Sequence, residues 1–290
     1  MARLLRSFLF VPGNNKRFID KAKALDADII CLDLEDSVPI NDKDSARQLI
    51  GDALKARSEF TGEVYVRTNS FDSGLVQDDL KAIVQKGIDG IVIPKVNDPN
   101  EVFELSKWVT NLEHERSIKE GMIEIMPSIE SAKGVVNAYK IASASPRVSA
   151  LVFGVFDFLL DMGLEYVEDG IEYSYARAKV PVDARAAGVY AIDSIWQKID
   201  DISGLIKDAT TGMKLGYKGK SIIHPSQIEP VHKIFVPNKE EVEWARKVVN
   251  ALSDAMSKGK GAVRLEGKMI DAVHYKRAKA LLDVIGEKTK

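Results

Sequence analysis

One pattern recurs through most of the chain: a short apolar run, a polar or charged residue at its end, and then a stretch with helical spacing. Strands that alternate with helices predict right-handed βαβ units and a parallel sheet. Eight such units in roughly 250 residues favour a (β/α)8 TIM barrel over a doubly wound sheet, which alternates in the same way. The eight runs are Phe8–Val11, Ile29–Leu34, Val64–Val66, Ile91–Ile93, Ile123–Met126, Leu151–Phe153, Val189–Ile192 and Ser221–Ile223.

The segments between these runs support the alternation. Asn41–Arg57 and Asp72–Lys86 each open with a residue that can cap a helix, and both carry apolar residues at helical spacing. Gly87 and Gly90 follow the second segment and end its helix before the fourth strand. We therefore expect α/β architecture throughout this part of the chain.

The sequence changes character beyond Pro237. A helix is expected over residues 239–257, followed by a glycine-rich turn and a last helix over residues 271–285. This pattern predicts a TIM-barrel domain over residues 1–236 and an appended C-terminal helical arm, or lid, over residues 237–290.

Composition excludes several classes of protein. The chain of 290 residues has 41 Lys and Arg against 43 Asp and Glu, and this balance argues against nucleic acid or an anionic membrane as a partner. The apolar stretch Leu4–Val11 contains Arg6 and is too short to cross a membrane. Cys31 is the single cysteine, so an intrachain disulfide and a thiolate zinc site are impossible. We expect a soluble, cytoplasmic protein.

Ionisable residues follow nearly every predicted strand, at the end of a barrel that carries the chemistry. Charges there are usually solvated loop ends, but so many of them converging on one mouth favour a functional site. The ionisable residues at these positions are Asp33, Glu35, Asp36, Arg67, Lys95, Glu130, Asp157, Asp193 and His224, and the neutral Asn69 follows the third strand with Arg67.

Glu130 and Asp157 are the candidate metal ligands. They are hard oxygen ligands on neighbouring strands, without a cluster of His or Cys nearby, and this chemistry suits Mg²⁺ or Mn²⁺. The alternative is that each carboxylate caps a helix, since Glu130 directly precedes the helical segment 131–141. Spacing alone leaves both interpretations open.

Arg67 follows the third strand, so its guanidinium starts at the barrel mouth. It could bind a substrate carboxylate or a developing enolate, or it could simply neutralise the nearby carboxylates. Composition does not choose between these roles.

The motifs on this frame resemble those of one family over the whole length of the chain. They are Leu9–Gly13, Leu32–Val38, Val66–Asn69, Ile93–Val96, Ile129–Ala132, Phe153–Phe158, Ala184–Gly188, Ile223–Gln227 and Met269–Asp271. In this order they resemble the citrate lyase beta-subunit-like and malyl-CoA/citramalyl-CoA lyase family, within the HpcH/HpaI aldolase superfamily.

The resemblance implies a Mg²⁺-dependent lyase that acts on acyl-CoA thioesters. It assigns Glu130 and Asp157 to the metal and substrate, and Arg67 to the reacting oxygens. Main-chain groups at Phe156 and Asp157 would meet the carboxylate of the oxo acid. Asp271 matches a catalytic aspartate on a lid that reaches into a neighbouring subunit's site, which implies a homo-oligomer, a trimer or a hexamer.

The resemblance also assigns residues around this centre. Four positions match the surround of CoA and substrate: Phe10, Lys21, Ile223 and His224. Three carboxylates are expected to order metal-bound water and Arg67: Asp33, Glu35 and Asp36. Many relatives carry a small or acidic residue at the position of Phe156, which therefore affects pocket size and substrate identity.

The reaction implied is cleavage of the C2–C3 bond of a 3-hydroxyacyl-CoA, such as citramalyl-, malyl- or citryl-CoA, to an acyl-CoA and a 2-oxo acid. Asp271 would protonate the enolate of the thioester. Two alternatives are a citrate lyase beta subunit that requires partner subunits and an aldolase for free 4-hydroxy-2-oxo acids. The arm with its Asp271 argues against the aldolase.

Overall fold

The chain is described by a computed structural model that covers residues 4–284, 286 and 287. Two compact units divide the chain, one over residues 5–234 and one that contains the residues from 235 onward. Each unit is described by itself.

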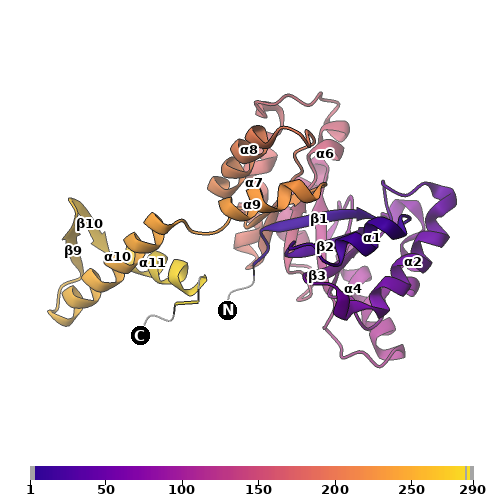
Figure 1. Cartoon of the computed structure of the whole chain (residues 1–290), viewed down its shortest axis with the longest axis horizontal. Helices are drawn as coiled ribbons and strands as arrows, with labels where there is room; N and C mark the ends of the chain where they lie inside the picture. The colour runs from indigo at the N-terminus through magenta and orange to yellow at the C-terminus, as the bar shows by residue number, and fades with distance from the viewer. Residues whose placement is uncertain (1–3, 285, 288–290) are drawn as a thin grey trace. The chain divides into compact units, whose positions relative to one another are not determined.

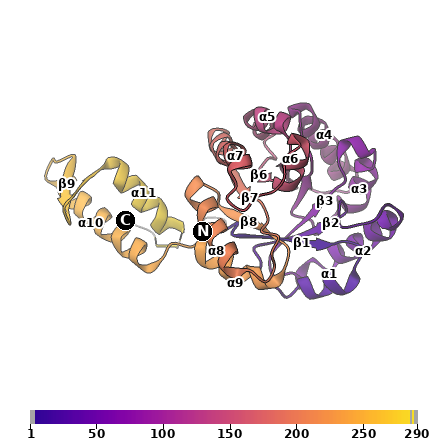
Figure 2. The same cartoon turned by 90° about the horizontal axis from the view of Figure 1, so that it is seen from above.

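Residues 5–234 form the predicted TIM barrel. Within this described range, eight parallel strands pair in chain order, and β1 closes the barrel on β8 (Figures 1 and 2). Each apolar run of the sequence pattern overlaps one of these strands, which confirms the predicted fold. The strands are β1 (Ser7–Pro12), β2 (Ile29–Asp33), β3 (Glu63–Arg67), β4 (Gly90–Ile93), β5 (Glu124–Ile129), β6 (Ala150–Phe153), β7 (Tyr190–Asp193) and β8 (Gly219–Ile222).

Helices surround the strands in the view of Figure 2. The α-helices are α1 (Lys16–Ala22), α2 (Lys43–Lys55), α3 (Val76–Ile83), α4 (Pro99–Glu115), α5 (Ala132–Ala142), α6 (Val155–Met162), α7 (Ser174–Ala186), α8 (Ile202–Leu215) and α9 (Ile228–Ile234). Short 3₁₀ helices are η1 (Ile40–Asp42), η2 (Arg57–Glu59), η3 (Phe71–Ser73), η4 (Ile171–Tyr173) and η5 (Pro225–Gln227).

Two helix starts were predicted too early. The segment expected to begin at Asn41 starts with a 3₁₀ turn, and α2 follows from Lys43. The segment expected to begin at Asp72 also starts with a 3₁₀ turn, because that residue lies in η3, and α3 follows from Val76. In both cases the capping residue belongs to the tight turn that precedes the α-helix.

The interior of the barrel is filled by large apolar side chains. Its core includes Phe8, Cys31, Tyr65 and Met126, all fully buried. Burial raises the pKa of the Cys31 thiol well above its ordinary value, as expected for an inert core cysteine. A Cβ on Gly90 would lie 2.1 Å from the Tyr65 ring, so the glycine makes room for this tyrosine.

The register of the strands sets the height of the side chains at the carboxyl end. Asp33 of β2 pairs with Arg67 of β3, so the two side chains leave neighbouring strands at the same level. Ile129 of β5 pairs with Phe153 of β6, and this brings Glu130 beside Gly154. A Cβ on Gly154 would lie 2.5 Å from Cγ of Glu130, so only glycine fits against that side chain.

The second unit contains α10 (Lys239–Ser257), β9 (Ala262–Leu265), β10 (Lys268–Asp271) and α11 (Ala272–Val284). The first helix has the predicted bounds, whereas Ile285, the expected end of the last helix, lies outside the described residues. The expected glycine-rich turn is an antiparallel hairpin, which the prediction missed. Its turn places Glu266 and Gly267 at φ 48° and 82°, values that favour glycine.

The described residues contain no helix with the length and apolar character needed to cross a membrane.

Candidate active site

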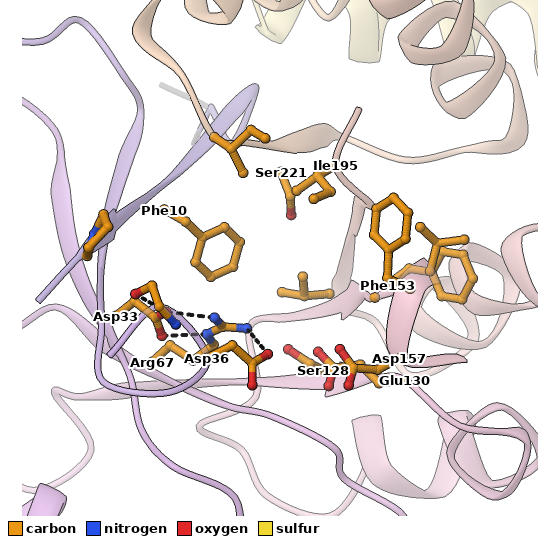
Figure 3. A pocket seen from close by; sticks show the side chains of 17 residues that line it. Phe10, Asp33, Asp36, Arg67, Ser128, Glu130, Phe153, Asp157, Ile195 and Ser221 are labelled. Atoms are coloured by element: carbon orange, nitrogen blue, oxygen red, sulfur yellow. Dashed lines mark hydrogen bonds and ion pairs between the residues drawn. The ribbon is translucent and has the colours of Figure 1, made fainter. Parts of the chain in front are cut away.

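A cavity of about 460 Å³ lies at the carboxyl ends of the barrel strands (Figure 3). Charged residues and apolar residues share its lining, and the charged ones come from β2, β3, the end of β5 and α6. The lining consists of Phe10, Pro12, Asp33, Asp36, Ser37, Arg67, Ser128, Glu130, Val152, Phe153, Gly154, Val155, Phe156, Asp157, Ile195, Ser221 and Ile223.

Arg67 is held by a two-pronged ion pair. Its Nε and Nη2 donate to Oδ1 and Oδ2 of Asp33, each at 2.7 Å, and Figure 3 shows this fork. The guanidinium also lies 4.8 Å from the centre of the Phe10 ring. Parallel donors on a planar group fix its orientation, so Arg67 faces the cavity in one geometry.

The carboxylates around Arg67 set its charge. Burial would lower the pKa of Arg67, but Asp33, Glu35 and Glu130 together raise it well above the ordinary value. Burial tends to raise the pKa of Asp33, but the charge and hydrogen bonds of Arg67 have the larger effect, so the pKa of Asp33 is lowered. Ser37 donates its hydroxyl to Asp33 at 2.6 Å. Arg67 and Asp33 therefore form a permanent ion pair in the wall.

Glu35 is a buried carboxylate between two cations. Its Oε2 lies 2.9 Å from Nη1 of Arg67, and its Oε1 lies 2.8 Å from Nζ of Lys95. Burial raises the pKa of Glu35 in spite of these partners. The three predicted supporting carboxylates thus differ: Asp33 and Glu35 hold Arg67 closely, whereas Asp36 lies 3.9 Å from it.

Lys95 contacts Glu35, which lies beside Arg67, as well as the candidate metal ligands Glu130 and Asp157. The sequence pattern assigned no role to this lysine. It adopts φ 55°, in the left-handed region, a conformation that costs a non-glycine residue about 1–3 kcal/mol. Its backbone N–H donates to Oε2 of Glu130 at 3.1 Å, and its Nζ lies 3.4 Å from Oδ1 of Asp157. The signal was its position directly after a strand and a proline, within the motif Ile93–Val96.

Glu130 is directed into the cavity. Ser131 provides the cap of α5, since its hydroxyl accepts the N–H of Gly134, so the helix-cap alternative for Glu130 is wrong. The side chain is buried, and burial raises the pKa of Glu130 to about 8, with Glu35 and Asp157 adding to the effect. The carboxylate therefore lacks sufficient positive charge around it.

Asp157 lies in the first turn of α6, where a carboxylate interacts favourably with the helix N-terminus. The cap position is Gly154, and no side chain makes a capping hydrogen bond there. The Asp157 side chain lines the same cavity as Glu130 and is about one-third exposed. It can therefore face both the helix end and a ligand in the cavity.

The donor set fits a hard divalent cation. Among the residues described, no group of three or more His, Cys, Asp or Glu side chains has the arrangement of a metal site. Mg²⁺, however, commonly takes one or two carboxylates and completes its sphere with water and substrate oxygens. Glu130 and Asp157 could hold such an ion, and the raised pKa of Glu130 is the sign of a carboxylate that lacks a cation.

An aromatic stack supports one wall. Phe156 packs against Tyr166 with ring centres 5.1 Å apart, and Tyr166 stacks on Tyr173 at 6.0 Å. Tyr173 in turn lies 5.9 Å from the guanidinium carbon of Arg177, measured to the ring centre. The Phe156 side chain, which lines the cavity, is therefore packed against further aromatic side chains behind it.

The four residues assigned to the surround of CoA and substrate separate into two groups. Phe10 and Ile223 line the cavity. Lys21 is exposed in the last turn of α1, and His224 caps η5, accepting the N–H of Ser226 at 3.2 Å. Neither Lys21 nor His224 belongs to the cavity lining, so their contact with CoA stays a prediction.

Asp193 does not reach the mouth, contrary to expectation. Ile192 points into the barrel, and Asp193 therefore points outward, where it pairs with Arg177 and Lys220. A Cβ on Gly212 of α8 would lie 2.3 Å from its carboxylate. Alternation along the strand, which the count of strand ends ignored, explains this difference.

Two serines of the cavity were not predicted. Ser128 lies in β5 and Ser221 in β8, and both side chains are buried. The hydroxyl of Ser221 has no hydrogen-bond partner among the described residues. The signal that would have found them is a serine next to the last residue of a buried strand, since both precede an isoleucine that ends its strand.

Asp271 belongs to the second unit, where it ends β10 and precedes α11, so the expectation that it begins a helix was wrong. Its Oδ1 accepts the backbone N–H of Val273 at 3.0 Å and lies 2.7 Å from Nδ1 of His274. The hydrogen bonds with His274 lower the pKa of Asp271. Its side chain is exposed.

Comparisons with known proteins agree with this description. The HpcH/HpaI aldolase/citrate lyase family matches residues 6–225. The citrate lyase subunit beta of Leuconostoc mesenteroides subsp. cremoris is 38% identical over 280 residues, 97% of this chain and 93% of that protein. Human mitochondrial citramalyl-CoA lyase is 33% identical over 284 residues, 94% of this chain and 83% of that protein. The structure of CitE from Mycobacterium tuberculosis, in complex with magnesium, acetoacetate and coenzyme A, is similar with a TM-score of 0.80 and 28% identity, and covers 99% of both chains.

Proposed function

Because this chain belongs to the HpcH/HpaI aldolase/citrate lyase family and is a carbon–carbon lyase, we propose that it cleaves or forms a 3-hydroxyacyl-CoA such as citramalyl-, malyl- or citryl-CoA. The products of cleavage are an acyl-CoA and a 2-oxo acid. One observation carries this proposal: a buried Glu130 and the nearby Asp157 share a cavity with the fixed cation of Arg67. Such a set can bind and polarise a hydroxy acid.

Glu130 and Asp157 are the residues that would hold a divalent metal, Mg²⁺ with Mn²⁺ as a substitute. When bound, that metal would act as a Lewis acid toward carboxylate and hydroxyl oxygens of the substrate. The structure of the relative from Mycobacterium tuberculosis contains magnesium and coenzyme A, which supports binding of a magnesium ion and of CoA by this chain. Asp33 fixes Arg67, and Glu35 and Asp36 add charge around it.

Arg67 would stabilise the charge that develops during cleavage. As the C2–C3 bond breaks, the hydroxyl at C3 gives its proton to a water molecule and its oxygen becomes the carbonyl oxygen of the 2-oxo acid. The electron pair of the broken bond passes to the thioester as an enolate, which then takes up a proton at C2. Asp33 engages Nε and Nη2 of Arg67 from one side, so the guanidinium is oriented before substrate arrives. A preorganised donor of this kind contributes to the rate because it need not reorient during the reaction.

The backbone at the start of α6 would orient the oxo acid. The N–H groups at the start of a helix lack partners within it, and Phe156 and Asp157 lie in this first turn. A carboxylate placed there would meet donors from the main chain. Apolar side chains of Phe10, Phe156 and Ile223 would surround the rest of the substrate and exclude water.

Asp271 would donate the final proton, to C2 of the enolate, from the lid of a neighbouring subunit. Its exposed carboxylate in the second unit is compatible with this role. The protein would then be a homo-oligomer, a trimer or hexamer, in the cytoplasm.

A mixture of Asp271→Ala and Glu130→Ala chains tests donation between subunits. Each variant should be inactive alone, with a loss of about 10²–10⁴-fold for the proton donor.

Activity should partly return in the mixture once subunit exchange is verified. Exchange creates sites with an intact Glu130 from one chain and an intact Asp271 from the other. The control is a mixture of two differently tagged Asp271→Ala chains, in which no site has an intact Asp271. This mixture should remain inactive. If exchange occurs and no activity returns, Asp271 acts within its own chain or has no part in the reaction.

The purified chain, assayed alone, tests the overall reaction. We expect release of a 2-oxo acid from at least one of citramalyl-, malyl- and citryl-CoA, lost on chelation of the metal and restored by Mg²⁺. Similarity to citrate lyase subunit beta at 38% identity favours a second candidate, a lyase that works only with partner subunits. Binding of Mg²⁺ without turnover of any thioester would support that alternative. Cleavage of a free 4-hydroxy-2-oxo acid at a comparable rate would overturn the requirement for CoA.

A further inference from the structure

Lys95 contacts both proposed metal ligands. Its backbone N–H donates to Oε2 of Glu130 at 3.1 Å, while its ammonium lies 3.4 Å from Oδ1 of Asp157. Two carboxylates of the β2 loop also pair with this ammonium, Glu35 at 2.8 Å and Asp36 at 3.4 Å. One residue thus links the wall that holds Arg67 to the pair that would hold the metal.

The backbone of Lys95 is fixed in this position. The residue has φ 55°, which a lysine rarely adopts, and persists there because neighbours on both sides determine it. Its carbonyl accepts Nδ2 of Asn97 at 3.1 Å, and the N–H of Val96 donates to the carbonyl of Ser128 at 3.2 Å. The left-handed turn directs the N–H to Glu130 while the side chain reaches Asp157.

We propose that Lys95 is a positioning residue that holds Asp157 and Glu130 for the metal and exchanges partners when the metal binds. Its ammonium is the resident cation on Asp157 before binding. With a divalent ion bound, Asp157 would serve as its ligand, and Lys95 would keep its pairs with Glu35 and Asp36. This inference rests on the proposed function, because it takes Glu130 and Asp157 as metal ligands.

This exchange of partners predicts an effect of Lys95 on metal affinity that is not expected if Lys95 only neutralises the carboxylates. If the ammonium competes with the metal for Asp157, then removing it should tighten metal binding while it impairs turnover. Two like charges within about 4 Å repel by roughly 1 kcal/mol even in water, which corresponds to about fivefold in affinity, and a divalent ion feels more. Turnover should fall because Glu35, next to Arg67, loses its closest ammonium.

Calorimetric titration with Mn²⁺ alone provides a readout that does not depend on activity. We expect Lys95→Met to bind Mn²⁺ about three- to tenfold more tightly than the wild type, and Lys95→Arg, which keeps the charge, to bind within about twofold. The matched control is Lys198→Met. Lys198 follows β7 on the same side of the barrel but pairs with Glu168. The substitution therefore removes the same charge without affecting the partner of Asp157.

Lys95→Gly provides a second variant in case Lys95→Met does not fold. Glycine adopts φ 55° without strain, so the hydrogen bond from the backbone to Glu130 is kept while the ammonium is lost. It should tighten Mn²⁺ binding as Lys95→Met does. In both variants kcat should fall more than tenfold at saturating metal, with thermal unfolding used to confirm the fold.

The outcomes separate this inference from the proposed function. Unchanged or weaker Mn²⁺ binding in Lys95→Met and Lys95→Gly, with wild-type binding intact, overturns the exchange and leaves the metal site in place. Equal tightening in Lys198→Met also overturns it, since general charge would then be sufficient. Absence of Mn²⁺ and Mg²⁺ binding in the wild type contradicts the metal site and the exchange together.

Discussion

Two clusters of charged side chains lie in the same barrel and differ in how their charges balance. In the first cluster, beside β7 and β8, Arg177 and Lys220 form ion pairs with Asp193 and Asp208. The Arg177 guanidinium lies 2.5 Å from the Asp193 carboxylate and 2.7 Å from that of Asp208. In the cavity cluster, among the described residues, two cations, Arg67 and Lys95, form ion pairs, and the ammonium of Lys43 lies nearby on backbone carbonyls. These three positive charges face five carboxylates: Asp33, Glu35, Asp36, Glu130 and Asp157.

The difference is visible in the carboxyl groups. Burial tends to raise the pKa of Asp208, but Lys220 and Arg177 outweigh it and lower the pKa. Burial also acts on Glu130, where the cations do not compensate, and the pKa rises to about 8. A buried cluster that neutralises itself needs no ligand and supports the fold. A buried cluster with surplus carboxylates is ready to accept a cation.

Removing a proposed metal ligand is the strongest test of this contrast. Glu130→Gln or Asp157→Asn should abolish detectable Mg²⁺ binding and lower turnover by at least about 10³-fold, because the metal supplies several kcal/mol to the transition state. Calorimetry measures the binding, and an oxo-acid assay measures the turnover. The thermal unfolding temperature of Glu130→Gln should stay unchanged or rise, since a buried carboxyl group without a balancing cation is removed, and that of Asp157→Asn should change little because Asp157 is about one-third exposed.

Glu168→Gln is the control for these variants. Glu168 is an exposed carboxylate outside the cavity lining, paired with Lys198, so its loss should change neither metal binding nor turnover. Wild-type affinity for Mg²⁺ in both cavity variants would show that the metal binds elsewhere.

Breaking the balanced cluster should produce the opposite pattern. Arg177→Met leaves Lys220 alone to balance the two carboxylates Asp193 and Asp208, and an incompletely compensated buried charge typically costs about 3–5 kcal/mol of stability. Denaturant unfolding of the metal-free protein measures this loss. Metal affinity of the fraction that remains folded should be unchanged, because this cluster does not line the cavity.

Lys179→Met on the same helix provides the comparison. Its ammonium pairs with Asp183 four residues along the helix and donates to the carbonyl of Val135, but it balances a single carboxylate, so its loss should cost only about 1–2 kcal/mol. A similar loss of stability in both variants would mean that burial of the Arg177 cluster adds nothing.

Arg67→Lys tests the part of the cavity cluster that is already neutralised. Lysine keeps the charge but cannot present parallel donors to Asp33 or to substrate, so kcat should fall about 10²-fold, the effect of losing one preorganised donor. Steady-state kinetics with saturating metal measures it, while Mn²⁺ binding should persist. Arg47→Lys, at an ion pair with Asp79 outside the cavity, is the control. A kcat within threefold of wild type would reduce Arg67 to a neutraliser of the acidic loop.

The sequence predicted the barrel well because its signal is periodic. Each strand is a short run buried on both faces, as in β2, where all five residues are buried. The functional residues at the ends of β2, β3 and β5 follow from the same pattern, since the register of parallel strands brings them to one level.

The features that the sequence did not predict depend on the direction in which a side chain or backbone group points, not on the position of the residue along the chain. Asp193 ends a strand as Asp33 does, yet it points outward because its neighbour Ile192 points into the barrel. The contact of Lys95 with Glu130 comes from a residue with a left-handed φ angle, a conformation that a lysine in the sequence does not indicate. The hairpin β9–β10 was also missed, because its short strands are half exposed and lack an apolar run.

The smallest effect distinguishes the clusters through pH alone. An acid whose pKa rises on folding keeps its proton in the folded state while the unfolded chain loses it. Stability therefore falls as pH rises from the ordinary value of Glu130, near 4.5, toward its folded value of about 8. The slope for one such group is about 1.4 kcal/mol for each pH unit.

We expect the metal-free wild type to lose stability between pH 6 and pH 8 in denaturant unfolding, and Glu130→Gln to lose less by roughly that slope. The comparison matters because burial raises the pKa of Glu35 too, and its contribution remains in both proteins. Asp208, whose pKa is lowered, contributes stability that is complete above the ordinary range of an aspartate and so adds no slope in this window. Identical slopes for wild type and Glu130→Gln would mean that Glu130 is ionised in the metal-free protein, and that the cavity cluster is as well balanced as the buried one.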